Sequence, residues 1–369
     1  MSTAASDRTQ AKPKRVGLVL GAGGVLGGAW LTGGMYAIAQ ATRWDPGSAE
    51  YIVGTSAGSM MGSLVAAGVP PWFMVAHSAG ETFEGVTGPD GRQSRDASRS
   101  AGAAFRLHRG LPRIGPGSLC MALGTMARPL SHTPGQLFAG WLPSGVFSTE
   151  SLKDTVRRAV RESWVDHPNF WAVATDYESG HRVPFGRDDA PEAEIADAVA
   201  ASCAIPGVFR PVEIGGRRYV DGGICSPSSL DLLADQDLDL VICLNPMSSL
   251  AQRVLRNPLD RLADVTRKGS GRRLGYEAKK VRASGTEVVL IQPTEEDLRL
   301  MGRNWMNSER RHDVIELAIK TVGEQLREPD VREGLRGLPE GEPHKIDRPD
   351  GPPSSWPPIA PSARGERAA

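Results

Sequence analysis

The chain contains 369 residues, enough for one large domain or two modest ones with a substantial buried core. Lys and Arg together number 43, and Asp and Glu also number 43, so the overall charge does not indicate a nucleic-acid partner or an anionic membrane. The four cysteines lack the spacing of a zinc site and are few for a disulfide framework. We therefore expect a reduced, intracellular protein that binds neither zinc nor nucleic acid.

The two ends of the chain differ in composition from its middle. Residues 1–14 are polar and predict a disordered leader without the apolar segment of a secretory signal. Residues 337–369 are rich in Pro, Gly and charged residues, which predicts a disordered tail. No run of 18 apolar residues occurs, so no membrane-spanning helix is expected. We expect one catalytic domain over residues 15–330, in the cytoplasm, with peripheral membrane contact left open.

The first ordered segment predicts a βαβ unit. Residues 16–20 are apolar and end in glycines, as a buried strand does, and residues 25–42 predict a helix. Residues 51–53 predict a second buried strand, and residues 56–67 a second helix that Gly68 closes. Strand, helix, strand and helix in this order predict an α/β fold with a parallel sheet.

Residues 80–147 show weak periodicity and are rich in Gly, Ser, Arg and Pro. Between 86 and 147 there are seven Arg and two Asp, a net charge of +5, and apolar residues stand between the arginines. A stretch of this length without clear elements is typical of a functional lid or of disorder. We expect an insert that either contacts phospholipid head groups at a membrane or is a solvated, flexible segment.

Regular elements return at residue 147. The later part of the chain predicts a helix over 150–161, a hairpin over 171–175 and 182–185, a helix over 191–202, strands over 238–244 and 287–291, and a helix over 312–326.

The segment 54–58 reads Gly-Thr-Ser-Ala-Gly, a GxSxG pattern between a predicted strand and a predicted helix. A serine on such a sharp turn is held exposed, and the helix N-terminus behind it favours developing negative charge. Gly54 and Gly58 allow the turn to form. The pattern therefore identifies Ser56 as a candidate nucleophile, against the alternative of a glycine-rich turn capped by serine.

The glycine-rich segment 21–24 also joins a predicted strand to a predicted helix, so its backbone N–H groups would form an anion cradle. A dinucleotide phosphate and a reaction oxyanion are the two candidate ligands. The dinucleotide pattern requires glycine at position 26, which is Leu26. We therefore favour an oxyanion hole formed by the N–H groups around Ala22, Gly23 and Gly24.

Two residues compete for the role of base. Asp221 stands between apolar residues and two glycines, as a carboxylate at the end of a strand does, although a tight Asp-Gly turn would look the same. A Ser-Asp-His triad would add His312, whose position near a helix start is more typical of a surface residue. The sequence favours Asp221 as the residue that activates Ser56.

Four motifs, in this order, resemble the patatin-like phospholipase family in its bacterial branch: GxGGxxG at 21–27, GxSxG at 54–58, ASxAIPGxF at 201–209 and DGG at 221–223. The resemblance spans residues 15–245. It implies a three-layer α/β/α sandwich with a mainly parallel central sheet, and release of acyl chains from lipids or esters without metal or cofactor. It implies that Ser56 is the nucleophile and Asp221 its base, without histidine. It also implies that the glycines of these motifs support the site: Gly21, Gly27, Gly54, Gly58, Gly222 and Gly223.

The chain departs from the family pattern at two positions. Leu26 stands where members often have Arg, and Ala22 stands where they often have Gly. A backbone donor survives at Ala22 if the turn geometry permits, whereas the missing Arg leaves open what braces the loop. A non-lipid carboxylesterase or thioesterase on the same fold, and a catalytically silent acyl-binding protein, are the alternative functions.

Overall fold

The computed structural model describes residues 14–81, 107, 115–127, 132–160, 162–249, 258–352 and 355–357. The strands are β1 (Val16–Leu20), β2 (Tyr51–Thr55), β3 (Phe170–Asp176), β4 (Arg182–Phe185), β5 (Val212–Ile214), β6 (Arg217–Asp221), β7 (Leu240–Leu244) and β8 (Glu287–Ile291). The helices are α1 (Gly24–Thr42), α2 (Ala57–Ala66), α3 (Pro71–Ser78), α5 (Leu119–Ala127), α6 (Pro134–Ala139), α7 (Glu150–Ala159), α8 (Ile195–Ser202), α9 (Pro258–Ala283), α10 (Glu295–Met301), α11 (Arg311–Gln325), α12 (Pro329–Gly334) and α13 (Pro343–Ile346).

The strands in the described part of the chain form one mixed sheet, in the order β5-β6-β3-β2-β1-β7-β8, with β4 paired to β3. Pairing is parallel from β3 through β2, β1 and β7 to β8, and antiparallel where β3, β4, β5 and β6 meet. The sheet is therefore mainly parallel, as the βαβ pattern predicts.

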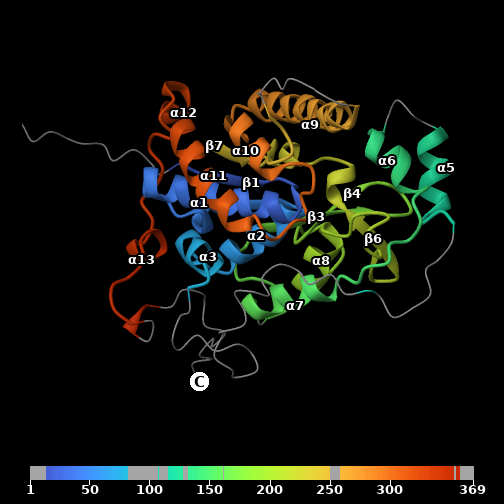
Figure 1. The fold of residues 1–369 in the computed structure, drawn as a ribbon, viewed down its shortest axis with the longest axis horizontal. Helices are drawn as coiled ribbons and strands as arrows, with labels where there is room; N and C mark the ends of the chain where they lie inside the picture. Colours follow the sequence, from blue (N-terminus) through green and yellow to red (C-terminus); the bar gives the residue numbers. More distant parts are fainter. Residues whose placement is uncertain are drawn as a thin grey trace, which may run out of the picture.

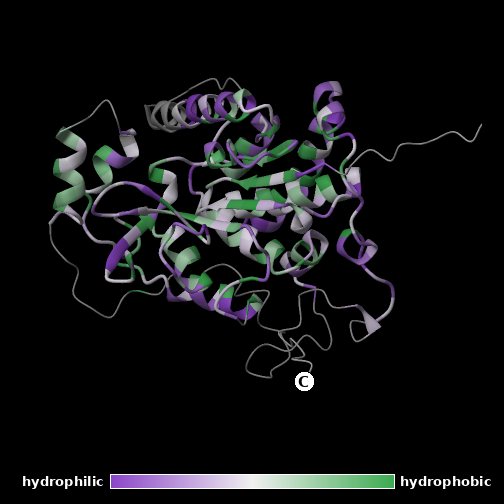
Figure 2. Cartoon of the chain, turned by 180° about the vertical axis from the view of Figure 1, so that it is seen from behind, coloured by the Kyte–Doolittle hydropathy of each residue, from purple (hydrophilic) through white to green (hydrophobic). Residues whose placement is uncertain are grey.

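Helices cover both faces of this sheet, which explains why its central strands are apolar at successive positions. Leu18 and Ile52 pack in the larger core with α1, α2, α8 and α11, whereas Val19 and Val53 pack in a second core with α9. Figure 1 shows α9 on one side of the sheet and α2, α3, α7 and α8 on the other. This arrangement confirms the predicted three-layer α/β/α sandwich, and the sheet is greener than the outer helices in Figure 2.

Most predicted elements are confirmed within a few residues, but the helix expected over 191–202 is shorter. It begins at Ile195, because Glu194, the residue before it, has an extended backbone with φ −69° and ψ 141°. In the insert, the described residues contain α5 and α6, which the weak periodicity did not predict. The seven arginines of 86–147 lie outside the described residues.

The tail differs from the predicted disorder as far as residue 352. It contains α13, where Ile346 is buried, and Trp72 of α3 donates a hydrogen bond from Nε1 to the His344 carbonyl at 2.9 Å. The Trp356 and Trp72 rings meet edge to face at 5.5 Å. A few apolar anchors suffice to order a segment whose average composition predicts disorder. Residues 358–369 lie outside the described residues, as do residues 1–13 of the predicted leader.

No helix of the described residues combines the length and the apolar character needed to cross a membrane.

Candidate active site

Ser56 occupies the sharp turn between β2 and α2. Its backbone has φ 54° and ψ −120°, a strained conformation for a residue other than glycine. The turn presses the start of α2 against the end of β1: a Cβ at Gly58 would lie 1.8 Å from the Leu20 carbonyl oxygen, and one at Gly54 2.5 Å from the Gly58 carbonyl oxygen. The glycines of GxSxG are therefore required by close backbone contact, and the strain at Ser56 is held by packing on both sides.

Asp221 ends β6 and faces Ser56 directly. The Ser56 Oγ donates a hydrogen bond to Asp221 Oδ2 at 2.6 Å, and the Gly223 N–H donates to Asp221 Oδ1 at 2.7 Å. The two residues are 165 positions apart in the chain, and both are buried. The structure thus brings together the two residues that the sequence proposes as nucleophile and base.

Ser202, at the end of α8, connects the turn to the sheet. Its Oγ accepts the Ser56 backbone N–H at 2.8 Å and donates to the Val173 carbonyl at 2.6 Å. This buried serine satisfies an N–H group that the strained turn would otherwise leave unpaired. The sequence showed Ser202 within the ASxAIPGxF motif but assigned it no contact.

Burial controls the charge of Asp221. Desolvation raises the pKa of its carboxyl from 3.8 to about 6, and the hydrogen bonds from Ser56 and Gly223 oppose that rise. The carboxylate is therefore a stronger base than an exposed aspartate, yet it is mostly ionised at neutral pH. A carboxylate of this kind can accept the hydroxyl proton of Ser56.

The glycine-rich loop between β1 and α1 lies beside this pair. The Ala22 N–H donates to the Pro227 carbonyl at 2.7 Å, so this donor of the predicted oxyanion hole is already engaged. Among the hydrogen bonds of the described residues, none uses the N–H of Gly23 or Gly24. These two groups are the donors that the loop can offer to an anion, and Gly24 has a φ of +61° that favours glycine.

A buried carboxylate from α9 holds the loop that follows Asp221. Glu277 is fully buried and accepts hydrogen bonds from the Ser226 and Ser228 hydroxyls, each at 2.6 Å, and from the Leu230 N–H at 3.1 Å. Arg273 supplies the opposite charge at 2.7 Å. Because Pro227 lies between the two serines and accepts the Ala22 N–H, Glu277 also fixes the position of the glycine-rich loop.

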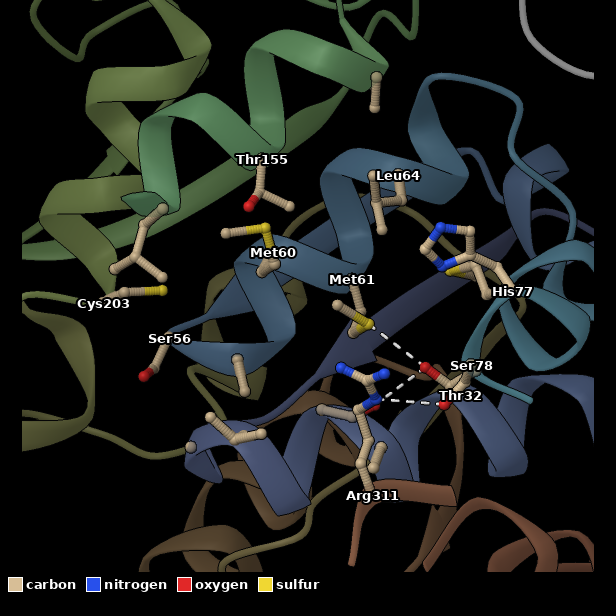
Figure 3. Close-up of a pocket in the computed structure, with 18 of the residues that line it drawn as sticks. Thr32, Ser56, Met60, Met61, Leu64, His77, Ser78, Thr155, Cys203 and Arg311 are labelled. Atoms are coloured by element: carbon tan, nitrogen blue, oxygen red, sulfur yellow. Dashed lines mark hydrogen bonds between the residues drawn. The ribbon is translucent and has the colours of Figure 1, made fainter. Parts of the chain in front are cut away.

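Ser56 lines a cavity of about 520 Å³ bounded by α1, α2, α3 and α7. Much of its wall consists of flexible or apolar side chains, among them Met60, Met61, Leu64, Phe73, Met74, Ile205, Phe209, Met306 and Ile315. Figure 3 shows Ser56 on one side of this cavity and the polar groups of His77, Ser78 and Arg311 on the other. A cavity of this size and character suits an apolar chain.

The histidines do not complete a triad in the described structure. His312 lies at the start of α11, where its Nε2 is 3.2 Å from Glu316, and it does not line the cavity. His77 lines the cavity, but burial and then the charge of Arg311 lower the pKa of its ring. The Ser56 hydroxyl instead donates its hydrogen bond to the Asp221 carboxylate.

The four cysteines are all free in the structure. Cys203 lines the cavity, and burial, followed by the charge of Asp221, raises the pKa of its thiol to about 12. A thiol in this state is a poor nucleophile at neutral pH, so it does not compete with Ser56. The described residues also contain no group of three or more His, Cys, Asp or Glu arranged to hold a metal ion.

The fold is a mainly parallel sheet between helices, and its candidate site pairs a strained serine, between a strand and a helix, with a buried carboxylate that accepts a hydrogen bond from the serine hydroxyl. The family model described as patatin-like phospholipase matches residues 18–234. The chain belongs to this family.

Three similar proteins are described as uncharacterized NTE family proteins, one from Mycobacterium bovis and two from strains of Mycobacterium tuberculosis. Each is 35% identical over 104 residues, which covers 28% of this chain and 28% of the relative. The match therefore spans little more than a quarter of these relatives. The crystal structure of VipD from Legionella pneumophila is similar with a TM-score of 0.38 and 14% identity, over 85% of this chain and 67% of that one.

Proposed function

We propose that this protein is a serine acyl hydrolase that cleaves acyl esters of lipids through Ser56 and Asp221. The observation that carries this proposal is the 2.6 Å hydrogen bond from the Ser56 hydroxyl to the buried Asp221 carboxylate, at the wall of an apolar cavity. Membership of the patatin-like phospholipase family supports an ester of a lipid as the substrate.

The reaction begins when Asp221 accepts the proton of Ser56 as Oγ attacks the ester carbonyl. In this proposal the tetrahedral oxyanion accepts hydrogen bonds from the N–H groups of Gly23 and Gly24, which no hydrogen bond of the described residues uses. The ester C–O bond then breaks, and the alcohol leaves with the proton that Asp221 returns. Water, deprotonated by Asp221, attacks the acyl-enzyme; the bond to Ser56 Oγ breaks, Asp221 returns the proton to Oγ, and the fatty acid is released.

The cavity selects the acyl chain in this proposal. Removing a chain of apolar carbons from water is worth about 0.8 kcal/mol for each CH₂ group. Four methionines (Met60, Met61, Met74 and Met306) adapt their shape to the chain. We therefore expect kcat/KM to rise with acyl length until the cavity is full.

The first experiment is labelling with a fluorophosphonate, which traps an activated serine independently of the substrate, followed by measurement of the intact mass. We expect one adduct on the wild type and none on Ser56→Ala. Ser78→Ala is the matched control, because Ser78 lines the other side of the same cavity and should leave labelling unchanged. An adduct on folded Ser56→Ala would refute the assignment of the nucleophile.

Esters of a single alcohol with acyl chains from two to sixteen carbons then separate a lipid hydrolase from a non-lipid esterase or thioesterase. Steady preference for the shortest chains, or for thioesters, would contradict the lipid substrate. Binding of fatty acid with no labelling and no turnover would identify a silent acyl-binding protein instead.

A further inference from the structure

Exposed apolar side chains concentrate in one part of the described surface. Nine large apolar side chains are markedly exposed, and eight of them fall between residues 107 and 146. They are Leu107, Leu119, Leu123, Met126, Phe138, Trp141, Leu142 and Val146, with exposed fractions from 41% to 69%. Apolar patches of this kind on a protein surface mark an interaction site.

Seven of these eight side chains, all except Leu107, belong to a unit with two different faces, formed by α5, α6 and the turn 140–146. Its inner face is packed: Met121 and Ala139 are buried with Tyr177 and Val220, and the Tyr177 hydroxyl donates to the Ala139 carbonyl at 2.9 Å. On α5, Leu119, Leu123 and Met126 are spaced along the outer face of the helix. Figure 1 shows α5 and α6 at the edge of the molecule, and Figure 2 shows α5 coloured largely as hydrophobic.

This unit adjoins the proposed active site on two sides. The Thr133 hydroxyl at the N-terminus of α6 donates to the carbonyl of Ile224, three residues beyond Asp221. Leu142 lies against Gly207: a Cβ added to Gly207 would be 3.5 Å from the Cβ of Leu142. In the sequence, Gly207 stands between Ile205 and Phe209, which both line the cavity. The apolar surface is therefore attached to the loops that carry the base and the cavity wall.

The charge of this segment suits one kind of partner. The described residues 115–127 and 132–149 contain no Asp or Glu. The whole stretch 97–149 contains no acidic residue and five Arg, which lie outside the described residues and contribute charge to the sequence around the unit. Since basic and apolar residues together bind anionic lipid surfaces, and Trp is favoured at the membrane interface, Trp141 and its neighbours match an anionic bilayer.

We propose that α5, α6 and the turn 140–146 dock this protein onto the surface of an anionic lipid bilayer. The inference rests on the proposed function, because a lipid acyl hydrolase meets its substrate at such a surface. Docking through this unit brings the loops of Asp221 and of the cavity wall to the bilayer that holds the substrate esters.

The test is flotation of the full chain with vesicles of phosphatidylcholine alone and with 30% phosphatidylglycerol. We expect the wild type to float with the anionic vesicles. Leu123→Glu/Phe138→Glu should lower the partition coefficient by about tenfold or more, because both apolar contacts are replaced by charges that anionic lipid repels. Tyr276→Glu is the matched control, since Tyr276 is equally exposed, at 65%, but lies on α9, and it should float like the wild type.

Hydrolysis of a short, soluble ester by the same variants separates the two proposals. Unchanged turnover in Leu123→Glu/Phe138→Glu shows that the variant is folded and that the loss concerns the surface. Wild-type flotation by that variant, equal flotation of the wild type with neutral vesicles, or no flotation at all would overturn the docking proposal. Flotation without any ester hydrolysis by the wild type would reject the proposed hydrolase and leave the lipid-binding surface standing.

Discussion

Replacing Asp221 by Asn should make the protein more stable while it abolishes labelling and hydrolysis. The Asn side chain has the shape of a protonated Asp, so its oxygen can still accept the Gly223 N–H and its amide can donate to Ser56. What disappears is a buried negative charge and, with it, the base of the proposed mechanism. We therefore expect the ionised Asp221 carboxylate to lower the free energy of unfolding while it supports the proposed reaction.

The size of the effect follows from the raised pKa of Asp221. A pKa that moves from 3.8 in the unfolded chain to about 6 in the folded protein costs the ionised wild type about 3 kcal/mol of unfolding free energy. Because the folded state holds the proton more tightly, protonated Asp221 carries none of this cost below pH 3.8, and the full cost appears as the pH rises through 6. Asn pays no such penalty, and its advantage should grow over that window.

Urea unfolding of wild type and Asp221→Asn at several pH values between 4 and 8 measures this directly. We expect nearly equal unfolding free energies at pH 4, and at pH 8 an excess for the variant approaching about 3 kcal/mol. Asp189→Asn is the control, because the Arg187 side chain lowers the pKa of exposed Asp189, so its replacement should not stabilise the protein at pH 8. An excess for Asp221→Asn that is absent at pH 8, or equally large at pH 4, would refute the assignment of a destabilised carboxylate.

Four further outcomes can be checked with the same preparations. The kcat/KM of the wild type should fall about tenfold for each pH unit below the Asp221 pKa of about 6, and a flat profile from pH 5 to 8 would contradict its role as base. Ser202→Ala should lower the unfolding free energy by about 1–3 kcal/mol and reduce the labelling rate, because the Ser56 N–H loses its acceptor. Glu277→Ala should destabilise by about 3–5 kcal/mol, as the positive charge of its salt bridge and two buried hydroxyls lose their partner; unchanged urea midpoints would disprove this. Gly58→Ala should prevent stable folding because of the clash with β1, whereas Gly124→Ala on exposed α5, with no atom within 4 Å, should stabilise by about 0.5–1 kcal/mol; thermal unfolding compares the pair.

Local sequence patterns were sufficient to predict the central strands and the helices that follow them. The strands around Leu18 and Ile52 are continuous apolar runs because they are buried on both faces, and the glycines after them mark the turns into α1 and α2. The sheet order was not predictable from these patterns, because it depends on contacts between segments far apart in the chain. The insert helices escaped prediction because their exposed apolar outer faces mask the usual periodicity.

The candidate site could be predicted as residue types, and only in part as contacts. Ser56 and Asp221 were identified from motifs, but the sequence showed neither the acceptor role of Ser202 nor the support of the loop by Glu277. Both are single polar residues whose partners lie many residues away. Likewise, the engagement of the Ala22 N–H by Pro227 is a tertiary contact that no local pattern indicates.

The α5–α6 unit keeps the exposed apolar surface apart from the Ser56–Asp221 pair. In the chain it lies between α3 and α7, after Ser56 and before Asp221. Its inner face packs against Tyr177 and against Val220 of β6. Substitutions on its outer face change side chains that contact neither member of the reactive pair. The proposed docking surface and the proposed active site can therefore be changed independently: substitutions on the outer face would direct the same Ser56–Asp221 pair to a different surface.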